Sequence, residues 1–78
     1  MRTFPELLKE YLQAAGISVS QLSRQSGLPR RTIANWLEGY AQKPRDWRDV
    51  ITLATALHLD RLATDDLLVS AGFPVLAT

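Results

Sequence analysis

Residues 19–38 read VSQLSRQSGLPRRTIANWLE, and this stretch decides the fold. Its apolar residues recur at the three- and four-residue spacing of an α-helix on both sides of Ser-Gly-Leu at residues 26–28. A turn of about three residues that contains glycine sets two consecutive helices at about 90–120° to each other. The stretch therefore predicts a helix-turn-helix unit.

The two helices of this unit have recognisable ends. Ser18, with Gln21 three residues later, carries the signature of a capping box, so the first helix is predicted over about residues 19–25. The second helix of the unit, which is the third helix of the chain, is predicted to begin near Pro29 and to stop at Gly39.

Helical spacing also fills the rest of the chain. A helix over about residues 4–15 precedes the unit, a fourth helix follows Asp46, and a fifth follows Asp60. The connections are about three to seven residues long, so the sequence predicts an all-α fold, a compact five-helix bundle. We expect residues 1–72 to form one domain and residues 73–78 to be a C-terminal tail or the start of a linker.

The expected helices bring apolar residues to a common core. These residues are Ile33, Trp36, Leu37 and Tyr40 in the third helix, Trp47, Val50, Ile51, Ala54 and Leu57 in the fourth, and Leu62, Leu67 and Leu68 in the fifth. Both tryptophans are therefore interpreted as core residues and not as platforms on which nucleic-acid bases stack.

The other face of the third helix is polar. Arg31, Asn35 and Glu38 lie opposite the apolar residues, with Ala34 beside them and Arg30 at the flank. Arginine is unfavourable at the start of an isolated helix, because the free N–H groups make that end partly positive. An anionic partner makes the same arrangement favourable.

The charge distribution points to the same region. The chain has nine Lys or Arg and eight Asp or Glu, for a formal net charge of +1. Residues 24–48 hold six of the basic and two of the acidic residues, a net charge of +4, whereas the remainder is at −3. One basic segment between acidic flanks suits a protein with a single face for an anionic partner.

Taken together, these features resemble the phage repressor and Cro-type helix-turn-helix DNA-binding domains, the lambda-repressor-like or XRE family, over about residues 4–70. Leu22, Leu28, Ile33 and Trp36 stand at the family's core positions, Ser23 at its small helix contact and Gly27 at its turn. The chain departs from the pattern at three positions. Val19 replaces a common glutamine that touches a phosphate, Ser26 a usual apolar residue, and Leu37 a frequent glutamate.

The resemblance implies double-stranded DNA as the partner, with the third helix in the major groove. By position, the base-contacting residues are Arg30, Arg31, Ala34 and Asn35. A guanidinium pairs with guanine, an asparagine amide with adenine, and a methyl group meets the methyl of thymine. The phosphate-contacting candidates, which orient the protein without reading sequence, are Ser18, Gln21, Arg24, Lys43, Arg45 and Arg48.

Other functions find little support in the residues. Cysteine is absent, one histidine is present and there is no glycine-rich phosphate loop, so we expect no catalytic site, no metal and no cofactor. His58 is interpreted as a left-handed residue after the fourth helix, and Asp60, Asp65 and Asp66 as carboxylates that stabilise the start of the fifth. No segment has the length of a membrane span, and we expect a cytoplasmic protein that is not an enzyme.

Two further points stay open. Domains of this family usually dimerise on half-sites, and the fifth helix and the apolar end AGFPVLAT are candidate surfaces for a homodimer. The alternative function is an N-terminal accessory or protein-interaction module of a larger bacterial signalling ATPase, which FPELLKEYLQ, PRRTIANWLEG and KPRDW also resemble. That alternative requires the natural chain to continue past Thr78 into a C-terminal domain.

Overall fold

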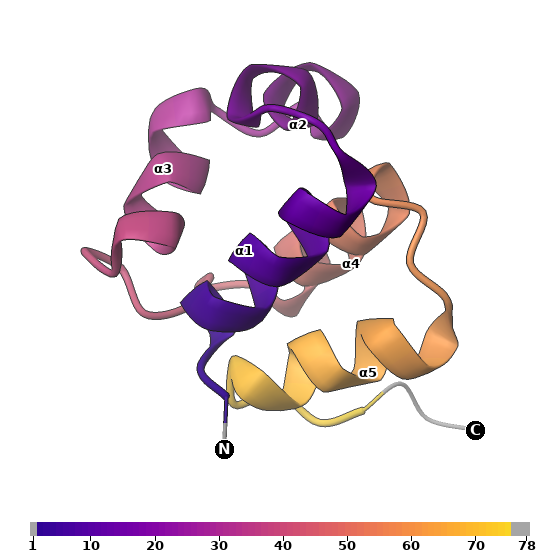
Figure 1. Cartoon of the computed structure of the whole chain (residues 1–78). Helices are drawn as coiled ribbons and strands as arrows, with labels where there is room; N and C mark the ends of the chain where they lie inside the picture. Colours follow the sequence, from indigo (N-terminus) through magenta and orange to yellow (C-terminus); the bar gives the residue numbers. More distant parts are fainter. Residues whose placement is uncertain (1, 76–78) are drawn as a thin grey trace.

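The computed structural model describes residues 2–75, which form five α-helices and contain no β-strand (Figure 1). The helices are α1 (Phe4–Ala15), α2 (Val19–Ser26), α3 (Arg30–Glu38), α4 (Trp47–Ala56) and α5 (Arg61–Ser70). The expected all-α fold with a helix-turn-helix in residues 19–38 is confirmed. Of the expected tail, residues 76–78 lie outside the described residues.

The helix starts follow the capping signals of the sequence. Ser18 Oγ accepts a hydrogen bond from Gln21 N at 3.1 Å, while Ser18 N donates to Gln21 Oε1 at 2.9 Å. Thr3 and Glu6 form the same reciprocal box at α1. An N-cap of this kind stabilises a helix by about 1 kcal/mol, so local chemistry fixes where α1 and α2 begin.

Two residues with positive φ mark turns that the fold requires. Gly27, at φ +77°, ends α2 and turns the chain toward α3. His58, at φ +57°, follows α4 and is the non-glycine residue with positive φ in the described chain, as its interpretation as a left-handed residue predicts. Histidine enters this region more readily than most side chains.

The core lies at the centre of the bundle, and all five helices contribute to it. Figure 1 shows α1 in the middle of the molecule, with α2 and α3 on one side and α5 on the other. The largest fully buried side chains come from all five helices and from the loop between α3 and α4, and are Phe4, Leu8, Leu22, Ile33, Pro44, Val50, Leu53, Leu67 and Leu68. Every helix therefore gives at least one side chain to a single apolar cluster.

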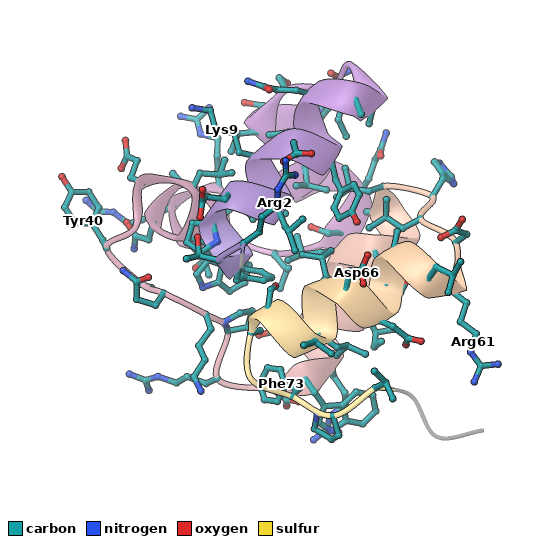
Figure 2. The ribbon with its side chains drawn as sticks, turned by 60° about the horizontal axis from the view of Figure 1, so that its bottom comes forward. Arg2, Lys9, Tyr40, Arg61, Asp66 and Phe73 are labelled. Carbon is teal, nitrogen blue, oxygen red and sulfur yellow. The ribbon has the colours of Figure 1, made fainter. Side chains whose placement is uncertain are left out.

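Three expected core residues are on the surface instead: Tyr40, Trp47 and Leu62. Leu62, in the first turn of α5, is 77% exposed. Tyr40 is 82% exposed, and Figure 2 shows its side chain pointing away from the ribbon. It lies beyond Gly39, whose φ of +82° ends α3, so the helical projection that placed Tyr40 beside Trp36 no longer holds. Trp47 is 47% exposed, because it is the first residue of α4 and has no preceding helical turn beside it.

Candidate nucleic-acid interface

The turn between α2 and α3 is held by two serine hydroxyl groups. Ser23 Oγ donates to the carbonyl oxygen of Leu28 at 2.6 Å, and Leu28 N donates to Ser26 Oγ at 3.2 Å. Both groups of the Leu28 backbone are thereby satisfied in a part-buried place, which an apolar residue at position 26 would not achieve. The hydroxyl groups fix how α3 leaves α2.

α3 is anchored along one side only. Ile33 is fully buried and Trp36 is 4% exposed, and together they hold the helix against α1 and α2. In Figure 1, α3 lies at the edge of the molecule, next to α2. The opposite side of α3 is thus free to meet a partner.

The predicted base-contacting residues share this outer part of α3, although not equally. Arg30 and Arg31 are exposed, whereas Ala34 and Asn35 are half-buried. Arg31 and Asn35 are four residues apart and lie on one stripe of the helix. The structure therefore places a guanidinium, a methyl group and an amide close together along one helix face.

Arg30 has a contact that its neighbour does not share. Its Nη1 donates to Ser20 Oγ at 3.0 Å, across from α3 to the first turn of α2. Sequence reasoning did not single out Ser20, because the two residues are ten positions apart and neither belongs to a capping pattern. Arg30 and Ser20 come together because α2 and α3 cross in the helix-turn-helix unit.

The first turn of α3 is free of negative charge. Pro29 precedes the helix at φ −59° and has no polar side chain with which to cap it, and the first three helical residues are Arg30, Arg31 and Thr32. The first N–H groups of a helix have no intrahelical acceptor and carry a partial positive charge. The opposite end of α3 carries the acidic Glu38, which is exposed.

The predicted phosphate-contacting residues fall into two groups. Ser18 and Gln21 at the start of α2 use one side-chain atom each for the capping box and keep a donor, and Arg24 is exposed in the last turn of α2. Lys43, Arg45 and Arg48 follow the other end of α3, and all three are exposed. A nine-residue helix rises about 12 Å between its first and last residues, so cationic groups stand at both ends of α3.

The second group has partners of its own. Arg48 Nε lies 3.3 Å from Asp46 Oδ1, and its guanidinium is 6.0 Å from the centre of the Trp47 ring. The pKa of Asp46 is below its ordinary value, first because Arg48 N–H donates to the carboxylate and then because of the arginine side chain. Lys43 Nζ lies 5.9 Å from the centre of the Phe73 ring. Arg45 is thus the member of this group that no aromatic ring or carboxylate in the described chain holds.

Residues 2–75 contain no group of three His, Cys, Asp or Glu side chains that would hold a metal ion. Asp60 caps α5, since its Oδ1 accepts from Ala63 N at 2.8 Å. Within the same residues, every helix is too short or too polar to cross a bilayer.

Comparison with known proteins agrees with this geometry. A family described as helix-turn-helix matches residues 8–46, which run from α1 through the whole of α2 and α3 to the start of α4. No curated protein and no solved structure matches the chain. The match covers half of the 78 residues and contains both helices of the unit. The chain therefore belongs to the helix-turn-helix family of the XRE or lambda-repressor-like kind, a family of DNA-binding transcription regulators.

Proposed function

We propose that this domain binds double-stranded DNA sequence-specifically, with α3 in the major groove. We propose that it acts in this way as the DNA-binding domain of a transcription regulator. The observation that carries the proposal is the two-sided character of α3. Ile33 and Trp36 fix one side in the core, while the N-terminal end exposes Arg30 and Arg31 to solvent. A rigidly held helix with a cationic tip suits the major groove, which admits one α-helix.

Base recognition is assigned chiefly to Arg31 and Asn35. A guanidinium donates two parallel hydrogen bonds to O6 and N7 of guanine, and an asparagine amide pairs in a similar way with adenine. Ala34, beside them on the helix face, offers a methyl group to thymine. These contacts require the helix to lie with its exposed stripe toward the base edges.

The two groups of cationic and polar residues at the ends of α3 are assigned to the DNA backbone. Phosphates near the N-terminal end of α3 would be contacted by Ser18, Gln21 and Arg24. Phosphates near its C-terminal end would be contacted by Lys43, Arg45 and Arg48. Contacts of this kind give affinity to any sequence and set the register of α3. A homodimer on two half-sites about 34–36 Å apart would double the contacts.

Selection of bound duplexes from a random pool, followed by titration at several salt concentrations, tests the proposal. We expect one preferred sequence and a plot of log K against log [salt] whose slope is about −0.9 for each phosphate neutralised. Arg31→Ala should reduce the preference at one base pair by about 1–3 kcal/mol, whereas Arg45→Ala should weaken every duplex by the same factor. Failure to bind any duplex at low salt would refute the proposal.

A further inference from the structure

The side chain of Arg30 is placed differently from that of Arg31, although the two are adjacent. At 100° per residue, Arg31 lies in the middle of the exposed stripe with Asn35 and Glu38, and Arg30 lies at its flank. The Arg30 guanidinium is directed to α2, where Nη1 donates to Ser20 Oγ at 3.0 Å. From this difference we infer that Arg30 is a phosphate-binding residue, positioned by Ser20, and that it reads no base.

The first argument is the direction in which Arg30 is held. A base-reading arginine directs its two parallel N–H groups at one guanine edge, so the guanidinium has to extend outward from the helix axis. The bond to Ser20 turns it sideways along the surface that α2 and α3 share. Four of the five guanidinium N–H groups stay available beside α2.

The second argument is the set of polar side chains at the start of α2, toward which Arg30 is directed. Ser18 and Gln21, on either side of Ser20, are exposed and each keeps a side-chain donor after capping. Val19 has no polar atom in its side chain and packs against the core. Arg30 is therefore the side chain that brings a full positive charge to this cluster of neutral donors.

The third argument is that the Ser20 hydroxyl can accept a hydrogen bond from Arg30 and donate one to a phosphate. Its oxygen accepts from Arg30, and its O–H remains a donor for the same phosphate oxygen. A fixed guanidinium with an adjacent hydroxyl group matches the geometry of a backbone phosphate, which accepts two hydrogen bonds from such a fork. Arg30 with Ser20 would then set the position of α3 on the DNA, and Arg31 would read it.

This inference rests on the proposed function, and the test separates the two. The full chain is titrated with its selected duplex and with a panel in which each base pair is changed in turn, at several salt concentrations. The variants are Arg30→Ala, Ser20→Ala and the two combined, with Arg31→Ala as the comparison. Arg61→Ala is the matched control for charge, because Arg61 is an exposed arginine on α5 that Figure 2 shows pointing away from the protein.

We expect Arg30→Ala to weaken binding to every duplex of the panel by one common factor, on the order of tenfold, as for the loss of one charged hydrogen-bonding contact. The salt slope should become shallower by about 0.9, the value for one phosphate. Ser20→Ala should cost less, and its cost should be smaller when Arg30 is already alanine, because only the hydrogen bond of the Ser20 hydroxyl to the phosphate is then lost. Arg61→Ala should leave the salt slope unchanged.

Two results separate the possible failures. If Arg30→Ala removes the preference at one base pair, or leaves the salt slope unchanged, the assignment of Arg30 is wrong while DNA binding stands. If the unaltered protein binds no duplex, the proposed function and this inference fail together. Arg30→Lys provides a second test, because it keeps the charge and loses the fork. It should retain the salt slope and bind all duplexes with one common, smaller loss.

Discussion

The aromatic rings of Phe4 and Trp36 pack edge to face, with ring centres 5.9 Å apart and ring planes at 85° to each other. Phe4 is the first residue of α1, and Trp36 lies in the last turn of α3. Both are almost fully buried, and the capping box at Thr3 fixes where α1 begins. The position of α3 therefore depends on how α1 starts, at a distance of more than thirty residues along the chain.

Truncation of this aromatic pair should destabilise the whole fold. Phe4→Ala and Trp36→Ala should each lower the free energy of unfolding by about 3–5 kcal/mol, since each leaves a cavity in the core. The double variant should lose about 0.5–1.5 kcal/mol less than the two losses added together, because the edge-to-face contact is removed only once. Urea denaturation followed by circular dichroism measures all three values.

Trp47→Ala is the matched control for the aromatic pair. Trp47 is 47% exposed and belongs to α4, so its truncation should cost less than about 1.5 kcal/mol. A cost for Trp47→Ala as large as that for Trp36→Ala would contradict the different burial of the two tryptophans.

Removal of the Ser23 hydroxyl should loosen the turn of the unit. Ser23→Ala leaves the carbonyl of Leu28 without its 2.6 Å hydrogen bond in a part-buried place, and we expect a loss of about 1–2 kcal/mol. Thr55→Ala removes an exposed hydroxyl that bonds only to the backbone of its own helix, so it should change stability by less than about 0.5 kcal/mol. Equal effects of the two substitutions would show that the Ser23 bond adds nothing.

Stability should fall on acidification, and two capping carboxylates should contribute to the fall. The pKa of Glu6 is below its ordinary value of 4.5, first because Thr3 N–H donates to it, and the pKa of Asp46 is below 3.8 for the corresponding reason at Arg48. A carboxyl group whose folded pKa is depressed stabilises the fold above its unfolded pKa, and that stability is lost as the pH falls through the folded value. The loss should therefore develop below about pH 4.5.

The matched variants for this prediction are Glu6→Gln and Asp46→Asn. Both replacements keep an oxygen that caps the helix, while neither side chain titrates. As the pH is lowered from 5, the double variant should lose less stability than the unaltered protein. Urea denaturation at each pH measures the two losses. An equally steep fall in the double variant would assign the acid sensitivity to other groups.

Local chemistry explains which parts of this molecule could be predicted from sequence. Ser18 with Gln21, Asp60 with its helix and Gly27 at the turn act over three or four residues, so their roles are visible in the sequence alone. The apolar spacing of Ile33 and Trp36 likewise predicted the buried side of α3.

The rest of the site depends on where helices end and cross. Tyr40 was misplaced because helical spacing was extended past the residue at which α3 stops, and Trp47 because it starts a helix. The Arg30–Ser20 contact could not be predicted, because it joins two helices whose crossing depends on the packing of the whole domain. Periodicity indicates which face is buried, but not which neighbour each exposed side chain meets.

Glu38 should oppose DNA binding, which makes it a sensitive probe of the face that α3 presents. It lies on the same stripe as Arg31 and Asn35 and is exposed at the C-terminal end of α3, where the helix dipole also disfavours a negative charge. Glu38→Gln should therefore raise affinity for every duplex at low salt, and the gain should shrink as salt screens the charge. The same substitution should leave stability unchanged or raise it by less than about 1 kcal/mol. Asp66→Asn on α5 is the control, because Asp66 is an exposed carboxylate on a helix that packs against α4 and α1, and its removal should change affinity much less. If Glu38→Gln lowers affinity, or relaxes the preference at one base pair, Glu38 itself accepts a hydrogen bond from a base such as cytosine, and the reading face extends to the end of α3.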